Sequence, residues 1–194
     1  MCVDYLSMRQ RLAASIAIAA EPFGWAGAAP GKCWHNVNQL TRSFGGKLVY
    51  GWALGKPGPC VMSGVQFPPL YTRWVNHALW RDENGQLWEA TPAFDEQNRT
   101  IMWEPTHFVL DDNAQFEIAT DEVCCPRPAV YVALQPQGEW TADCLCQAER
   151  AQRDMQDCWI ERAVYSLRVS GLQPISWRAK RVGEKLRDIS IMVQ

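Results

Sequence analysis

An Asn-Gly dipeptide, Asn84-Gly85, restricts the folds open to this chain more than any other short motif in it. The segments "RWVNHALWRD" (73–82) and "QLWEAT" (86–91) lie on either side of it. Both are rich in β-branched and aromatic residues, as strands are. Asn-Gly favours the backbone conformation of a tight turn between antiparallel strands. The sequence therefore predicts a β-hairpin over residues 73–91.

The predicted hairpin brings a histidine and a carboxylate onto neighbouring strands. If Asn84 and Gly85 form a two-residue turn, Glu83 pairs with Gln86, and residue numbers that face each other sum to 169. His77 then faces position 92, and Glu89 lies about three residues along the adjacent strand. A bulge or a longer loop would change which side chains share a face.

A helix is predicted over "CWHNVNQLTRSF" (33–44), ahead of the hairpin. Apolar residues recur there at three- and four-residue steps, and Gly45-Gly46 supplies a helix stop. Cys33 falls in the first turn. The unpaired N–H groups and the dipole of a helix N-terminus favour a thiolate over a thiol.

The remaining segments predict an α+β fold, in which the helix from Cys33 packs on a mainly antiparallel sheet. Strands are expected at 47–54, at 100–111 with a break at Pro105, and within 122–136, whereas the Pro- and Gly-rich segment 55–64 predicts a break. Two further helices are expected at about 141–169 and 177–187.

Length and composition are those of an ordinary globular chain. With 194 residues, 47% of them hydrophobic and 21% charged, we expect a single domain over 1–194, with a core at about 22–135 and a C-terminal helical extension at about 139–194. A net charge of −2 gives no bulk attraction to phosphate backbones or anionic membranes. We therefore expect neither nucleic acid nor a membrane as a partner, and the oligomeric state stays open.

The N-terminal segment "RQRLAASIAIAA" (9–20) has two interpretations. Arginines before an apolar run, with "AGAA" (26–29) following, imitate a secretory leader. Helical spacing of its apolar residues and a stop at Glu21-Pro22 favour an amphipathic helix instead. The apolar run is too short to span a bilayer, which takes about 18 residues or more. We expect the helix and a cytoplasmic protein, with secretion as the alternative.

The eight cysteines are irregularly spaced, unlike those of a small disulfide scaffold, and we expect reduced thiols. Five of them fall within 35 positions in the second half of the chain and raise the alternative of a structural zinc site: Cys124, Cys125, Cys144, Cys146 and Cys158. Their close "CC" and "CLC" spacing is poorly suited to chelation. We expect no metal and no cofactor.

Cys33, His77 and Glu89 together form a candidate catalytic set. A cysteine nucleophile needs a lowered pKa, a base nearby, and a third group that orients the base. Taken alone, each has an ordinary structural explanation, and free cysteine is among the most buried residue types. His35 and His107 are alternative bases, although His35, two positions from Cys33 on one helix, would point elsewhere.

Three short segments in order resemble transglutaminases and the wider papain-like superfamily of cysteine enzymes. "GKCW" (31–34) resembles their Gly-x-Cys-Trp segment, "NHALW" (76–80) their His-x-Trp strand, and "EATP" (89–92) their Asp-(Ala/Ser)-Thr-Pro segment. The resemblance implies a papain-like core with Cys33 as nucleophile, His77 as general base and acid, and Glu89, in place of the usual Asp, as the orienting carboxylate.

The function implied by this resemblance is a thiol hydrolase or acyltransferase that acts on an amide of a protein or peptide substrate through a thioester. Peptidase, amidase, deamidase and transglutaminase activities all remain open. The alternative is an inactive domain of the same fold that binds a protein or peptide in its groove.

The sequence also offers candidates for the oxyanion donor and for the walls of the cleft. The backbone N–H of Cys33 is the natural oxyanion donor, and the indole of Trp25 is a candidate side-chain donor. Four other tryptophans are candidate cleft walls or core residues: Trp34, Trp52, Trp74 and Trp80.

Overall fold

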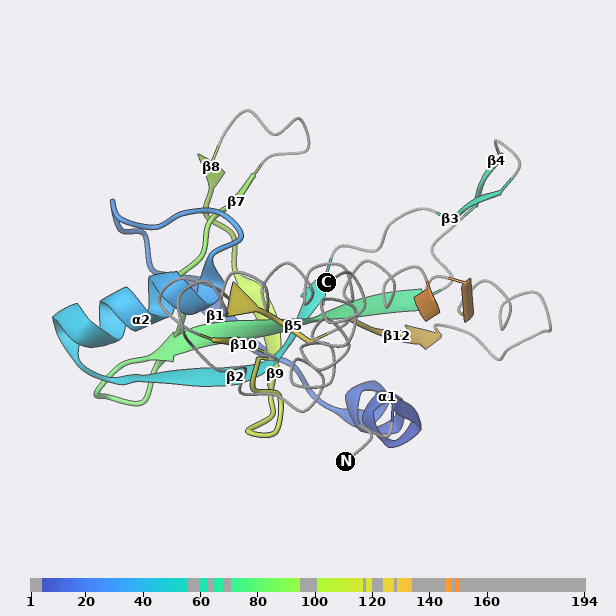
Figure 1. Ribbon diagram of the computed structural model, residues 1–194, viewed down its shortest axis with the longest axis horizontal. Coiled ribbons are helices and arrows are strands. Elements are labelled where there is room, and N and C mark those ends of the chain that lie inside the picture. Colours follow the sequence, from blue (N-terminus) through green and yellow to red (C-terminus); the bar gives the residue numbers. More distant parts are fainter. Residues whose placement is uncertain are drawn as a thin grey trace, which may run out of the picture. The chain divides into compact units, whose positions relative to one another are not determined.

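The computed structural model describes residues 5–55, 60–62, 65–67, 71–94, 101–116, 118–119, 124–127, 129–133, 146–147 and 149–150 (Figure 1). Over this part the protein is α+β, as predicted. The helices are α1 (Tyr5–Ala14) and α2 (Cys33–Phe44). The strands are β1 (Ile18–Pro22), β2 (Lys47–Gly55), β3 (Cys60–Met62), β4 (Val65–Phe67), β5 (Tyr71–Arg81), β6 (Leu87–Glu89), β7 (Ala93–Phe94), β8 (Ile101–Met102), β9 (Thr106–Leu110), β10 (Ile118–Ala119), β11 (Cys124–Cys125) and β12 (Val130–Ala133).

The chain forms two compact units, and the candidate catalytic set lies in one of them. That unit comprises Ala14–Leu54 and Asn76–Gln115. The other comprises Met1–Ala13, Gly55–Val75 and Phe116–Gln194. The predicted single domain over 1–194 stays a prediction.

Five strands close into a small barrel. Their hydrogen-bonded order is β5, β2, β9, β1 and β6, and β6 pairs again with β5. The pairings β1–β9, β2–β9 and β5–β6 are antiparallel, and β1–β6 is parallel. The predicted mainly antiparallel sheet is confirmed for these pairs. The pairing of β6 with β5 closes the sheet on itself.

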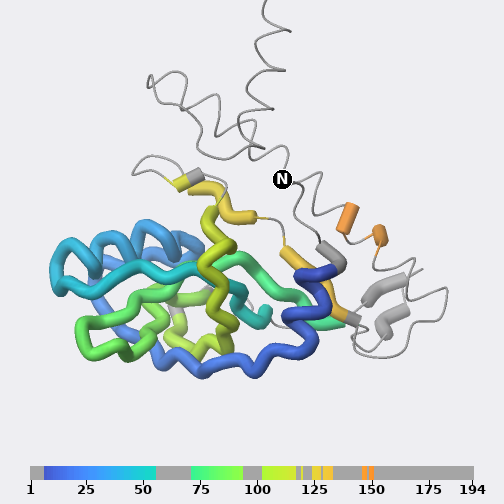
Figure 2. The backbone as a smooth tube through the Cα atoms, turned by 90° about the horizontal axis from the view of Figure 1, so that it is seen from below, coloured from blue at the N-terminus to red at the C-terminus, as the bar shows by residue number. Residues whose placement is uncertain are grey.

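The core of this unit combines barrel residues with one face of α2. Trp52 and Phe108 are among the largest fully buried side chains, and Val37 and Leu40 of α2 are fully buried too. Figure 2 shows α2 running beside β2, and Trp80 of β5 donates its indole N–H to the Gly45 carbonyl at the end of the helix at 3.0 Å. The apolar stripe of α2 therefore faces the sheet, as the residue spacing predicts.

The N-terminal segment differs from its prediction. The helix α1 ends at Ala14, and Ile18–Pro22 forms strand β1 instead of the end of a longer helix. Ala20 is fully buried and pairs with Thr106. Strand pairing on both sides, with β9 and β6, outweighs the high helix propensity of the alanines in this short run. Within the predicted break at 55–64, Cys60–Met62 forms strand β3 and pairs with β4.

The hairpin exists, but its turn is longer than predicted. Trp80 pairs with Trp88, so facing residue numbers sum to 168 and not 169. The loop has three residues between Asp82 and Gln86, and Gly85 has a φ of 87°. The Asp82 carboxylate accepts the N–H groups of Asn84 at 3.0 Å and Gln86 at 2.9 Å, which stabilises this loop over the two-residue turn.

The unit that contains α1 is stabilised by apolar, ionic and strand contacts within the unit. Met8 and Leu12, one turn apart on α1, are buried, and Arg9 forms an ion pair with Glu149. Strand β12 pairs with the first half of β5, where the rings of Tyr71 and Tyr131 meet edge to face at 5.0 Å.

Most of the predicted C-terminal extension (about 139–194), with the helix at 177–187, lies outside the described residues. Of the helix predicted at 141–169, the described residues 146–147 and 149–150 are helical. No helix in the described ranges is both long enough and apolar enough to cross a membrane.

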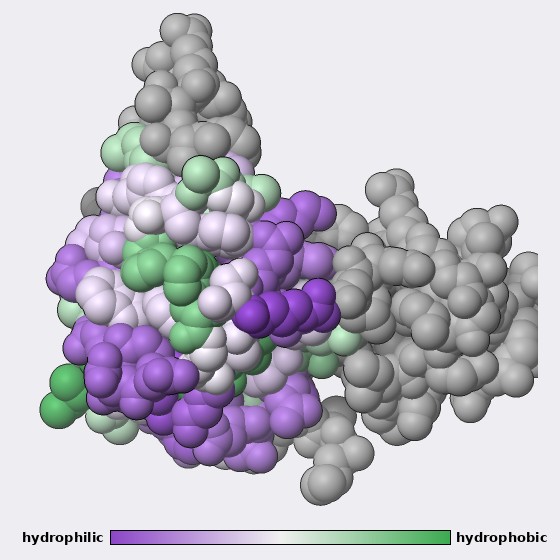
Figure 3. Space-filling model, turned by 90° about the vertical axis from the view of Figure 1, so that its left-hand side faces the viewer, coloured by the Kyte–Doolittle hydropathy of each residue, from purple (hydrophilic) through white to green (hydrophobic). Residues whose placement is uncertain are grey.

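The described residues on the face drawn in Figure 3 are mostly hydrophilic or of intermediate hydropathy. On the face drawn in Figure 3, a small group of hydrophobic residues is surrounded by hydrophilic ones. The exposed large apolar side chains within the described ranges are Ile16, Ile18, Phe44, Leu54 and Met102. A few exposed apolar side chains are normal on a folded protein.

Candidate functional site

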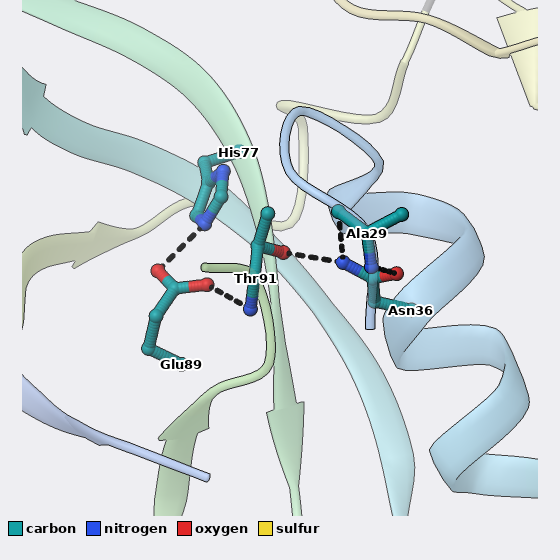
Figure 4. A network of polar contacts seen from close by, with 5 residues as sticks. All are labelled: Ala29, Asn36, His77, Glu89 and Thr91. Atoms are coloured by element: carbon teal, nitrogen blue, oxygen red, sulfur yellow. Dashed lines mark hydrogen bonds and ion pairs between the residues drawn. The ribbon is translucent and has the colours of Figure 1, made fainter. Parts of the chain in front are cut away.

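A histidine and a carboxylate meet inside the barrel unit. His77 on β5 and Glu89 at the end of β6 lie with Nε2 and Oε2 2.8 Å apart (Figure 4). The Glu89 side chain is 3% exposed and that of His77 is 17% exposed. A carboxylate so deeply buried needs partners, because desolvation of an unpaired charge is costly.

The three-residue loop of the hairpin explains why these side chains meet. Continuing the observed register, Glu89 lies opposite Leu79, two residues from His77 on the same strand. Residues opposite each other, and those two positions along, share a face. In the predicted register Glu89 would lie opposite Trp80, on the other face from His77.

Every oxygen of the Glu89 side chain is engaged. Oε2 contacts His77, Oε1 accepts the Thr91 N–H at 2.8 Å, and the Thr106 side chain adds a further hydrogen bond. The Glu89 carbonyl accepts the Phe23 N–H at 2.8 Å, which joins this strand end to the start of the loop that leads to α2. The carboxylate is therefore held from three separate segments.

The surroundings favour the charged forms of both partners. Burial raises the pKa of Glu89, but the nearby His77 and the hydrogen bonds from His77, Thr106 and Thr91 outweigh it, so the pKa lies below its usual value of 4.5. Burial lowers the pKa of His77, but the charges of Glu89 and Cys33 and hydrogen bonds with both hold it well above its usual value of 6.5. An imidazolium is thus favoured between these two residues.

Cys33 occupies the first residue of α2, as predicted, and is a free, half-buried thiol. It lies close enough to His77 for its charge and a side-chain hydrogen bond to contribute to the raised pKa of the imidazole. Because Nε2 of His77 faces Glu89, Nδ1 is the ring nitrogen left for the thiol. Lys32, which precedes the helix, makes no side-chain hydrogen bond that caps the N-terminus of α2. The structure thus brings together Cys33, His77 and Glu89.

The other two histidines are placed differently. His35 packs its ring edge to face on Trp34 with the centroids 5.2 Å apart. His107 is exposed on β9, where it pairs with Ala19. Of the three histidines, His77 is therefore the one with a thiol and a buried carboxylate as hydrogen-bond partners.

Trp25 remains a candidate oxyanion donor. Its indole Nε1 is buried and has no hydrogen-bond partner among the described residues. Gly27 lies so close to its ring that a Cβ there would overlap it, which fixes the indole against the loop before α2. Trp34 donates its own Nε1 to the Tyr50 hydroxyl at 3.2 Å and is half-buried.

The other candidate cleft walls are core residues. Trp52, Trp74 and Trp80 are 1%, 7% and 5% exposed. These three tryptophans thus pack inside their units. Aromatic content alone could not separate these two roles.

Sequence reasoning missed three side chains of the network, Asn36, Thr91 and Thr106. Asn36 is 2% exposed, on the buried side of α2, and the one available signal was an amide where an apolar residue is expected. Thr106 carries no local signal, because its contact with Glu89 depends on the place of β9 in the barrel.

No cluster of three or more histidine, cysteine or acidic side chains suited to a metal occurs within the described ranges. Within the described ranges, Cys33, Cys124, Cys125 and Cys146 are not part of a disulfide. Cys144 and Cys158, which completed the alternative zinc set, lie outside the described residues.

No family model, curated protein or solved structure matches this chain. A functional inference therefore depends on the atoms of the site: a thiol, an imidazole and a buried carboxylate in hydrogen-bonded series. Such a series can generate a nucleophile and deliver a proton to a leaving group.

Proposed function

We propose that this protein is a thiol-dependent hydrolase or acyltransferase that acts on an amide of a protein or peptide. The observation that carries the proposal is the contact of His77 with both the Cys33 thiol and the buried Glu89 carboxylate. A solvated structural histidine needs neither partner. Three groups in this order are those that an activated sulfur nucleophile requires.

The reaction uses the three groups in two steps. His77 takes the proton of Cys33, and the thiolate attacks the amide carbonyl carbon to form a tetrahedral intermediate. As the C–N bond breaks, His77 gives its proton to the leaving amine, and an acyl thioester remains on Cys33. Water or a second amine then attacks the thioester, with His77 accepting its proton, and the Cys33 thiol is restored.

Glu89 stabilises the imidazolium that exists between these proton transfers. It holds the Nε2 side of the ring, so that Nδ1 faces the sulfur. Developing negative charge on the carbonyl oxygen would be met by the backbone N–H of Cys33 at the start of α2, with Trp25 as the candidate second donor. No cofactor or metal is required for these steps.

The order of parts supports a papain-like, transglutaminase-like core as the fold. A helix carries the nucleophile, and the base and the carboxylate follow on the successive strands β5 and β6. The longer side chain of Glu in place of Asp still reaches the ring at 2.8 Å.

Selective alkylation tests the nucleophile. Limiting iodoacetamide at about pH 6.5, followed by peptide mass spectrometry, compares Cys33 with Cys146, a free thiol that is exposed. We expect Cys33 to react about tenfold faster than Cys146 despite its lower exposure, because only the thiolate reacts. His77→Ala should remove that advantage and leave the rate of Cys146 unchanged. A Cys33 rate at or below that of Cys146, unaffected by His77→Ala, contradicts the proposal.

A peptide library tests the reaction itself. The protein is incubated with the library in the presence and absence of methylamine, and the products are identified by mass spectrometry. Hydrolysis, deamidation or methylamine incorporation that disappears in Cys33→Ala supports the proposal and identifies the acyl acceptor. Peptides that are retained but unchanged would favour the alternative of a non-catalytic binding domain.

A further inference from the structure

A buried amide links the helix that carries Cys33 to the segment that holds Glu89. Asn36 lies three residues after Cys33 on α2, so the two side chains occupy neighbouring positions on one side of the helix. The Asn36 side chain points from the helix toward Ala29 on one side and Thr91 on the other (Figure 4).

The polar groups of Asn36 are satisfied by two different segments. Its Oδ1 accepts the Ala29 N–H at 3.0 Å, and its Nδ2 donates to the Ala29 carbonyl at 2.9 Å. Nδ2 also donates to the Thr91 hydroxyl at 3.3 Å. Both N–H donors and the carbonyl are thus used, which a side chain that is 2% exposed requires.

Thr91 connects Asn36 to the Glu89 carboxylate through two hydrogen bonds. Its hydroxyl accepts from Asn36, and its backbone N–H donates to Oε1 of Glu89 at 2.8 Å. The other oxygen of Glu89 holds His77. A continuous chain of hydrogen bonds therefore runs from the nucleophile helix to the imidazole, without passing through the sulfur.

The choice of asparagine at this position is not explained by helix stability. Asparagine has a lower helix propensity than leucine, and burying its amide brings no apolar transfer energy. Val37 and Leu40 of the same helix are the apolar residues that anchor α2 to the core. An amide at position 36 is suited to joining the backbone of Ala29 to the hydroxyl of Thr91.

We propose that Asn36 and Thr91 are positioning residues, which together fix the distance between the Cys33 sulfur and the His77–Glu89 pair. The inference rests on the proposed thiol chemistry and assigns these two side chains to it. Asn36 also fixes Ala29, in the loop that carries Trp25. Neither residue touches the reacting atoms, and both act through Glu89 and the placement of the helix.

The test variant is Thr91→Val, which keeps the shape and the backbone N–H of residue 91 but removes the hydroxyl acceptor. We expect it to lower the ratio of Cys33 to Cys146 alkylation rates at about pH 6.5 by about tenfold, because small displacements of catalytic groups are costly in rate. Thr91→Ser retains a hydroxyl and should restore most of the ratio. Asn36→Ala should lower the ratio at least as far as Thr91→Val.

Thr41→Val is the matched control. Thr41 lies on α2 and donates its hydroxyl to the Val37 carbonyl at 2.9 Å, within the helix. Its loss should leave the alkylation ratio unchanged, because this hydrogen bond is local to the helix and does not reach the Asn36–Thr91 link. The positioning role is overturned if Thr91→Val affects only stability, or if Thr41→Val lowers the ratio equally.

The two proposals fail in different ways. If Cys33 of the unmodified protein reacts no faster than Cys146, the thiol chemistry itself is wrong. If Cys33 is fast, loses its rate in His77→Ala and keeps it in both Thr91→Val and Asn36→Ala, the chemistry stands and the positioning role is rejected.

Discussion

At the scale of single residues, the charge of Glu89 governs the candidate site. The carboxylate is buried, yet its pKa lies below the usual value because His77 and hydrogen bonds from two threonines favour the ionised form over the effect of burial. The imidazole of His77 shows the opposite shift for the same reason. The pair is a coupled unit, and a change to either member alters the other.

Glu89→Gln tests this coupling. Glutamine retains an oxygen for the Thr91 N–H but carries no charge, so the pKa of His77 should fall from its raised value toward or below the usual 6.5, since burial then opposes protonation with less compensation. Titration of the His77 ring resonance by nuclear magnetic resonance measures the change. His35 and His107 are internal references. An unchanged His77 titration would contradict the coupling.

At the scale of elements, the β5–β6 hairpin decides which side chains meet. Its loop contains Gly85 in the left-handed region at a φ of 87°, with open space where a Cβ would lie. Asp82 supports the loop through two backbone N–H groups and accepts the Trp88 indole N–H at 3.0 Å. The pKa of Asp82 is lowered first by that indole contact and then by the backbone N–H groups.

Gly85→Ala should destabilise the protein by about 1 kcal/mol, because a Cβ is strained in the left-handed conformation even where space is free. Gly85→Asn should cost less, since asparagine tolerates that conformation better. Urea unfolding of the three proteins measures both effects. Equal stabilities for Gly85→Ala and the unmodified protein would show that residue 85 does not need a positive φ in solution.

At the scale of the whole molecule, the His77–Glu89 pair makes stability depend on pH. The pKa of Glu89 is lowered in the folded protein, so the ionised carboxylate contributes to stability. This contribution is complete above pH 4.5 and is lost as the pH falls through the pKa of Glu89 in the folded state. The pKa of His77 is raised in the folded protein, so the imidazolium also contributes to stability. That contribution is complete below pH 6.5 and is lost as the pH rises through the pKa of His77 in the folded state. The pair therefore stabilises the fold most between these two limits.

His77→Ala should lower the free energy of unfolding by about 3 kcal/mol within that window, because it leaves a buried carboxylate without its charged partner. The difference in free energy of unfolding from the unmodified protein should become smaller below and above this pH window. Urea unfolding at a series of pH values measures it. His107→Ala, a change at an exposed histidine, is the control. A difference that stays constant across the series would rule out the ion pair as its source.

Local signals were enough for the helix that carries the thiol and for the existence of the hairpin. Helix α2 spans Cys33–Phe44 as predicted, because apolar spacing and the Gly45-Gly46 stop act within a few residues. The same signals misread Ile18–Pro22, whose strand conformation comes from partners far away in the chain, β6 and β9. Long-range pairing leaves little trace in a short apolar run.

The sequence by itself determined which three side chains to test and the elements that carry them. The tertiary structure alone decided that they meet. A register one residue different would turn Glu89 away from His77, and that register depends on Asp82 holding a three-residue loop. The link through Asn36 and Thr91 likewise joins segments 55 residues apart, whose contact follows from packing α2 on the barrel and not from any local pattern.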